Sequence, residues 1–152
     1  MSIEDKLKEL GIELQTPPSP VANYIPVQQT GNLIYLSGQG PRDEEGNFIT
    51  GKVGADISAE QAYDLSRNTA VNLISAMKSY LGSLERVVKI VKVFGMVNAT
   101  SDFTDHPKVI NGCSDFFVEV FEDKGRHARS AVGMGSLPNN MAVEIEIIVE
   151  VS

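Results

Sequence analysis

An arginine set among small residues is the first candidate for chemistry in this chain. Residues 127–132 (HARSAV) read as a strand, and Glu144 follows Arg129 by fifteen residues. The small neighbours leave room for a ligand beside the guanidinium, whose fork of N–H donors matches a carboxylate in bidentate geometry. The same two residues could instead form a structural ion pair between adjacent strands, and the spacing favours neither interpretation.

Other reactive side chains are few. His106 and His127 are the only histidines, and no third ligand is spaced to complete a metal site with them. Cys113 is the only cysteine, so the chain cannot form an internal disulfide. It falls within an apolar stripe, where a packed thiol is expected rather than a nucleophile. We therefore expect no metal site.

Two long stretches have the periodicity of amphipathic helices. Residues 58–81 and 105–121 carry apolar residues at spacings of three and four, which gives each an apolar stripe to bury. Ser58 and Gln61 have the spacing of a capping box, in which each side chain satisfies a free amide of the first turn. A shorter helix and a proline-rich connector are expected within residues 1–20.

The remaining segments are rich in β-branched and aromatic residues and predict strands. In the last of them apolar residues alternate with glutamates, so one face is expected to be buried and the other polar. The expected strands are residues 23–29, 33–37, 48–50, 86–98, 129–134 and 141–151, the first two joined as a hairpin by a turn at 30–32. This order predicts a single α+β domain over residues 1–152, with one mixed sheet and two helices packed on one of its faces.

The charge balance limits the partners. Lys+Arg is 13 and Asp+Glu is 20, which gives a formal net charge of -7. Nucleic-acid binding usually requires a basic patch, so a nucleic acid is not expected as the main partner. No stretch approaches the ~18 apolar residues of a membrane span, and the first residues lack the apolar segment of a signal peptide. We expect a cytoplasmic protein without membrane contact.

Three segments resemble the signature of a known family. They are residues 30–39 (TGNLIYLSGQ), residues 128–132 (ARSAV) with Leu137-Pro138, and residues 143–146 (VEIE). These segments resemble the signature of the reactive intermediate deaminase family, also called RidA or YjgF and formerly labelled L-PSP endoribonuclease. The resemblance extends over nearly the whole chain, from about Asn23 onward. The N-terminal helix is similar to that of a longer branch of this family.

The resemblance implies a chorismate-mutase-like fold and a homotrimer with three clefts between subunits. In the deaminases of the family an arginine in the place of Arg129 clamps the substrate carboxylate, and a glutamate in the place of Glu144 orients water or moves protons. Tyr24 would line the cleft, and Gly38 would contribute backbone contacts. The substrates would be enamines and imines of small 2-amino acids, hydrolysed to 2-keto acids and ammonia without a cofactor.

Departures from the family pattern bear on activity. The cysteine often found two residues after the arginine is Ala131 here, which remains a candidate lining residue. The family's helix asparagine aligns with Ile110, and Asn111 is one step further, a rotation of about 100° on a helix. Asn111 is therefore the candidate for the site-lining role of the family's asparagine. His127 is a candidate replacement proton carrier, the alternative being a surface histidine at the start of a strand.

Two functions stay open. One is an enamine and imine deaminase that holds Arg129, Glu144 and a water in one cleft. The other is a non-catalytic binding module for a small carboxylate or keto acid, which Ala131 and Ile110 favour. A ribonuclease, as the older family label suggests, is disfavoured by the net charge of -7 and by the lack of a paired-histidine site.

Overall fold

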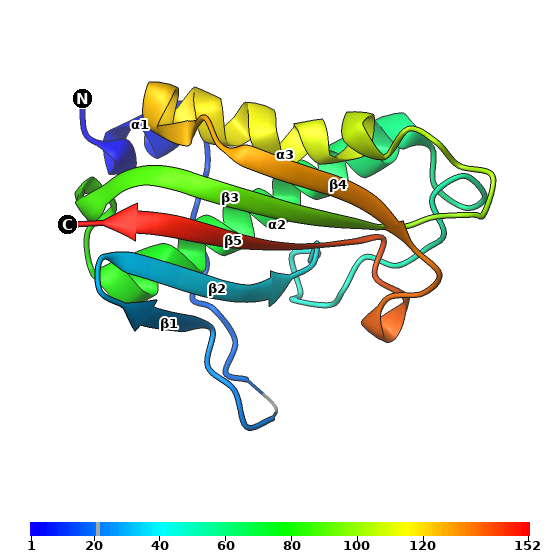
Figure 1. Ribbon diagram of the computed structural model, residues 1–152, viewed down its shortest axis with the longest axis horizontal. Coiled ribbons are helices and arrows are strands. Elements are labelled where there is room, and N and C mark those ends of the chain that lie inside the picture. The colour runs from blue at the N-terminus through cyan, green and yellow to red at the C-terminus, as the bar shows by residue number, and fades with distance from the viewer. Residues whose placement is uncertain (21) are drawn as a thin grey trace.

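The computed structural model describes residues 1–20 and 22–152 and contains a five-stranded mixed sheet (Figure 1). The strands lie in the order β1-β2-β5-β3-β4, and β3 and β4 are the parallel pair. The remaining neighbours are antiparallel. The bounds are β1 (Val27–Thr30), β2 (Leu33–Gln39), β3 (Val87–Asn98), β4 (Ala128–Met134) and β5 (Val143–Val151).

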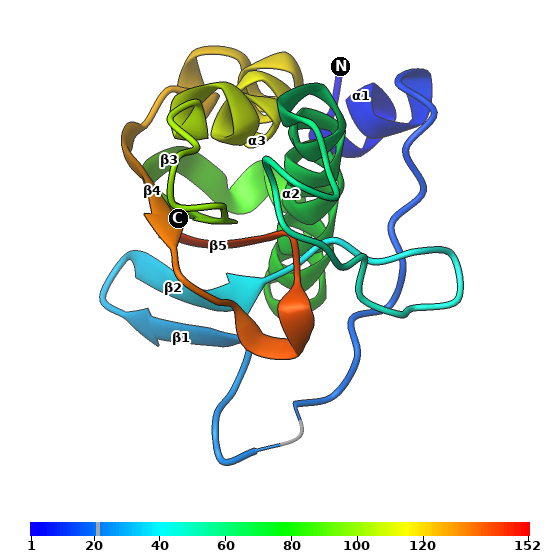
Figure 2. The ribbon, with the colours of Figure 1, turned by 90° about the vertical axis from the view of Figure 1, so that its right-hand side faces the viewer.

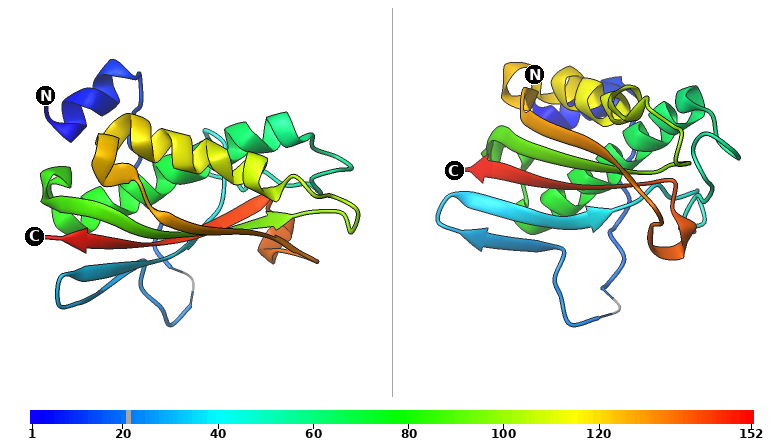
Figure 3. Two further views of the ribbon diagram at one scale, coloured as in Figure 1. Left: turned by 45° about the horizontal axis from the view of Figure 1, so that its top comes forward. Right: turned by 45° about the vertical axis from the view of Figure 1, so that its right-hand side comes forward.

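Helices cover one face of this sheet and leave the other face open within the chain (Figures 1 and 3). They are α1 (Ile3–Glu9), α2 (Ala59–Leu81) and α3 (His106–Phe121). The predicted capping box is present, because the Ser58 side chain accepts from the Gln61 N–H and the Gln61 side chain accepts from the Ser58 N–H. The predicted α+β fold, with one mixed sheet and α2 and α3 packed together on one face, is therefore confirmed.

The alternation in β5 decides what each face of the sheet carries. Five of its apolar residues, Val143, Ile145, Ile147, Val149 and Val151, are at most 2 % exposed and belong to the core beneath the helices, whereas Ile148 is only partly buried. Glu144, Glu146 and Glu150 alternate with them, as period two requires. These glutamates therefore lie on the open face.

Several predicted strands differ from the structure in their bounds, and one is absent. β1 begins at Val27 rather than at residue 23, and the residue before it is Pro26, which has no N–H to donate to a ladder. Residues 48–50 form no strand and contribute only isolated bridges. β5 begins at Val143 because the short helix η3 (Pro138–Asn140) and a turn precede it.

The N-terminal segment is tied to the domain at α1. Leu7 is buried in the core, and Glu4 Oε1 accepts from Lys78 Nζ at 2.8 Å and from the Leu84 N–H at 3.0 Å. After α1 the connector runs along the side of the molecule toward the loop that follows β2 (Figure 2).

Candidate functional site

Arg129 lies on β4, one of the two edge strands of the sheet, and its side chain reaches toward α3. Its Nη1 donates to Asn111 Oδ1 at 2.8 Å and to Ser114 Oγ at 3.1 Å. Among the described residues, Nε and Nη2 have no hydrogen-bond partner. Those two N–H groups form one edge of the guanidinium and are the pair that grips a carboxylate side-on. Arg129 is therefore held at one nitrogen and presents a free bidentate edge.

His127 lies beside this arginine, half-buried rather than on the surface. Its Nδ1 is 2.6 Å from the Gly125 carbonyl oxygen and its Nε2 is 2.9 Å from Ser114 Oγ. Its ring packs edge-on against Phe117, with 6.1 Å between centroids. Burial lowers the pKa of His127 below its usual value of 6.5, the Arg129 charge lowers it further, and the Gly125 carbonyl opposes both. The imidazole is accordingly neutral at neutral pH.

Asn111, and not Ile110, is the residue of α3 that contacts Arg129. Ile110 is fully buried and packs on Gly95 of β3, where its Cδ1 is 2.7 Å from the position that a Cβ would take. The one-step rotation that separates the two residues turns Asn111 toward the margin of the helix and onto Arg129. Asn111 therefore contacts the arginine although the family asparagine aligns one residue earlier.

Sequence analysis missed Ser114, which contacts both Arg129 and His127. It follows Asn111 by three positions, so the two side chains share one face of α3. In the sequence, the signal that could have revealed Ser114 is this three-residue spacing of polar residues beside the apolar stripe of the helix.

Glu144 does not meet Arg129 within the chain. β3 separates their two strands, so the cross-strand ion pair considered as an alternative is wrong. Val93, the register partner of Arg129, lies in the core beneath the helices, whereas Glu144 pairs with Met96 on the open face. The two residues therefore lie on opposite faces of the sheet.

Gly38 and Glu144 form a second group on that open face. The Glu144 carboxylate occupies the position that a Cβ on Gly38 would take, so glycine permits the close approach. Burial raises the pKa of Glu144 above its usual value of 4.5, and the neighbouring Glu146 carboxylate raises it further. A carboxyl group in this state can exchange protons nearer to neutral pH than an exposed glutamate.

The remaining candidates join neither group by a direct polar contact. Ala131 follows Arg129 on the same face of β4 and packs partly against the core. Tyr24 is 53 % exposed and precedes β1, at the edge of the sheet opposite β4. One copy of the chain therefore carries the candidate residues at three separate places.

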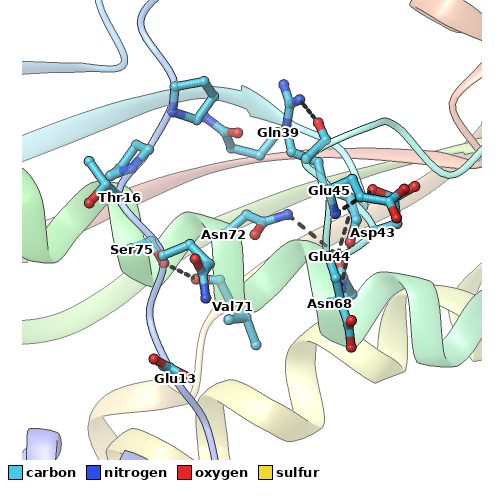
Figure 4. Close-up of a pocket in the computed structure, with 15 residues that line it drawn as sticks. Glu13, Thr16, Gln39, Asp43, Glu44, Glu45, Asn68, Val71, Asn72 and Ser75 are labelled. Atoms are coloured by element: carbon cyan, nitrogen blue, oxygen red, sulfur yellow. Dashed lines mark hydrogen bonds between the residues drawn. The ribbon is translucent and has the colours of Figure 1, made fainter.

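A pocket of about 680 Å³ lies elsewhere, between the N-terminal connector, α2 and the loop after β2 (Figure 4). Its walls include Glu13, Gln39, Asp43, Asn68 and Asn72. The candidate site residues all lie outside it, namely Tyr24, Gly38, Asn111, His127, Arg129, Ala131 and Glu144.

Within residues 1–20 and 22–152, no three His, Cys, Asp or Glu side chains are grouped to hold a metal ion. Every helix in that part of the chain is too short or too polar to cross a bilayer. Cys113 is buried, which raises the pKa of its thiol far above the usual value, while the Arg129 charge acts in the opposite direction.

Comparison with known proteins gives relatives over almost the whole chain. It is 38% identical over 147 residues to Protein TCP17 of Trypanosoma cruzi, covering 96% of this chain and 92% of that one. It is 32% identical over 139 residues to the 2-iminobutanoate/2-iminopropanoate deaminase of Dermatophagoides farinae, covering 90% and 93%.

Solved structures agree with the fold. Atu1372 of Agrobacterium tumefaciens, a protein of unknown function, superimposes with a TM-score of 0.92 at 41% identity, covering 99% of this chain and 92% of that one. A putative endoribonuclease of Shewanella oneidensis superimposes with a TM-score of 0.95 at 29% identity, covering 99% and 100%. Residues 4–151 match the family model described as "YjgF/chorismate mutase-like, putative endoribonuclease". The chain therefore belongs to the RidA/YjgF family, as the sequence motifs predict.

Proposed function

We propose that this protein hydrolyses reactive enamines and imines of small 2-amino acids to 2-keto acids and ammonia. The observation that carries the proposal is the free Nε and Nη2 edge of Arg129, because every such substrate presents a carboxylate next to the reacting carbon. The relatives named 2-iminobutanoate/2-iminopropanoate deaminase support the same reaction.

The reaction adds water across the C=N bond and expels ammonia. In the proposal, Arg129 fixes the carboxylate, which holds the imine carbon in reach of water. Glu144, with its raised pKa, takes a proton from the attacking water and returns one to the departing nitrogen. The Gly38 backbone, beside that carboxylate, approaches the substrate without a side chain in the way.

The proposed site lies between copies of the chain in a homotrimer. Arg129 and Glu144 face opposite sides of one sheet, so one substrate reaches both only when β4 of one copy meets the open face of another. Tyr24, at the far edge of the sheet, would likewise come from a neighbouring copy. A small carboxylate-bearing metabolite is the only partner that this proposal needs besides the chain itself.

A non-catalytic module that binds small keto acids is the second candidate. Ala131 favours it, because its methyl group packs toward the core and offers no polar group to a substrate. Such a module would keep the Arg129 clamp and lack turnover.

The deciding experiment measures ammonia and keto-acid release from 2-aminoacrylate generated in situ, with wild type beside Arg129→Ala. Faster release by the wild type, lost in the variant while sedimentation still gives a trimer, supports catalysis with Arg129 as the clamp. No acceleration together with tight keto-acid binding supports the binding module. A monomer at micromolar concentration overturns the site between subunits.

A further inference from the structure

Ser114 joins Arg129 to His127 in one chain of hydrogen bonds between α3 and the start of β4. The chain runs from the Gly125 carbonyl through both nitrogens of His127 to Ser114 Oγ and on to Arg129 Nη1, with heavy-atom distances of 2.6, 2.9 and 3.1 Å. Each link is short enough to be a hydrogen bond.

Chemistry fixes the direction of every link in this chain. The Gly125 carbonyl can only accept, so Nδ1 of His127 carries the proton. In the neutral imidazole Nε2 is then an acceptor, and the Ser114 hydroxyl donates to it. The Ser114 lone pairs are thereby left to accept from Arg129 Nη1.

We propose that Ser114 and His127 are positioning residues that hold the Arg129 guanidinium in its carboxylate-binding orientation. Without His127 the Ser114 hydroxyl would rotate freely and its proton could face the arginine. With His127 as acceptor, Ser114 and Asn111 both accept from Nη1, which turns the Nε and Nη2 edge outward. The proposal rests on the proposed function, because it takes Arg129 as the carboxylate clamp.

This role differs from proton transfer by His127. Both ring nitrogens of His127 are already engaged, one with Gly125 and one with Ser114. The groups that face the ring are the Phe117 edge and Ser114 on α3, the Gly125 carbonyl, and the Arg129 charge on β4. Arg129 is the charged group among them.

Ligand binding and protonation of His127 should consequently be linked. The imidazolium would donate from Nε2 to Ser114 and leave the Ser114 proton facing Arg129, so the carboxylate-binding orientation requires the neutral ring. The carboxylate should therefore bind less tightly as pH falls through the pKa of His127, and by reciprocity binding should lower that pKa. Proton transfer to substrate is not part of this coupling.

The test is calorimetric titration of the assembled protein with 2-oxobutanoate at pH 8 and pH 5.5. We expect Ser114→Ala and His127→Phe to weaken binding about tenfold, as loss of a hydrogen bond to a charged group does. His127→Gln keeps an acceptor near the place of Nε2, so it should bind at pH 8 within about twofold of wild type and lose the pH dependence. Ser79→Ala, at an exposed serine of α2, is the matched control.

A second readout follows the imidazole itself. Nitrogen-15 spectra of labelled protein should give His127 as the Nδ1–H tautomer, with a pKa that falls when 2-oxobutanoate is added and rises in Arg129→Ala. A histidine without a positioning role would respond only to the nearby charges, so its pKa would rise when the carboxylate binds.

Each outcome decides one claim. If Ser114→Ala and His127→Phe bind like wild type while Arg129→Ala loses binding, the clamp stands and the positioning role is overturned. If Arg129→Ala binds like wild type, the clamp of the proposed function is overturned. Ser114→Ala removes a single oxygen, so it keeps the test informative should His127→Phe fail to fold.

Discussion

Arg129 and Glu144 face opposite sides of one sheet, although each carries a feature suited to the same reaction. Arg129 lies in register with Val93 on the helix side, and Glu144 lies in register with Met96 on the open side. A side chain on one face of a pleated sheet cannot reach a ligand on the other. Under the proposed function the two residues therefore meet only across an interface between copies.

Replacement of Arg129 by lysine should abolish the side-on grip. Lysine keeps the charge but presents a point charge instead of two parallel N–H groups, and it cannot reproduce the contact with both Asn111 and Ser114. We expect kcat/KM for 2-aminoacrylate to fall about 10- to 100-fold in Arg129→Lys, with unfolding little changed. Steady-state assays and thermal melts check this, and wild-type kcat/KM in the variant would contradict a bidentate clamp.

Asn111 and Ile110 should have separable effects despite being neighbours. Asn111→Ala removes an acceptor from Arg129 Nη1, so we expect about tenfold weaker binding of 2-oxobutanoate with a small effect on stability. Ile110→Ala empties a fully buried site against Gly95 and should cost about 2–5 kcal/mol of unfolding free energy. Calorimetry and urea unfolding of both variants measure the contrast. Equal stability losses in the two would show that Asn111 acts only in packing.

A methyl group at Gly38 should displace the Glu144 carboxylate. No Cβ fits there unless the Glu144 side chain moves, so we expect Gly38→Ala to lower kcat/KM about tenfold or more. Gly135→Ala is the matched control, because nothing lies within 4 Å of its added Cβ and its backbone needs no glycine. Similar activities of the two variants would remove Glu144 from the reaction.

The raised pKa of Glu144 has a consequence for stability that depends on pH. Its folded pKa lies above the unfolded value of 4.5, so its favourable contribution is complete below that value and is lost as pH rises through the folded pKa. Glu144→Gln does not titrate, so its stability relative to wild type should increase across that window and level off above it. Urea unfolding from pH 4 to pH 8 measures the difference, and a difference that shrinks with pH would contradict the direction of the shift.

The open face of the sheet should be needed for assembly. Tyr35 lies on that face and is 43% exposed, and Tyr80 of α2 is 45% exposed on the helix side. Under the homotrimer proposal, Tyr35→Asp places a charge in an interface and should produce monomers without deaminase activity, whereas Tyr80→Asp should not. Sedimentation velocity of both variants tests this. A trimeric Tyr35→Asp variant would exclude the open face from the interface.

Local sequence patterns predicted the elements well and their ends less well. Ser58 and Gln61 marked the start of α2 correctly because a capping box depends only on nearby atoms. The start of β1 was placed too early, because Ile25 and Tyr24 suit a strand by type whereas the ladder begins after Pro26. The small residues around Arg129 and the family motifs both singled out this arginine, and the structure leaves its Nε and Nη2 without a partner among the described residues. Its contact with Ser114 was not predicted.

The sequence by itself determined the two helices, the alternation of β5 and the family, because periodicity and motifs are properties of neighbouring residues. Only the tertiary structure decided that β3 lies between β4 and β5, which separates Arg129 from Glu144. It also decided that Asn111 rather than Ile110 faces the arginine. Strand order and helix rotation are set by how the whole core packs, and no short stretch of sequence contains that information.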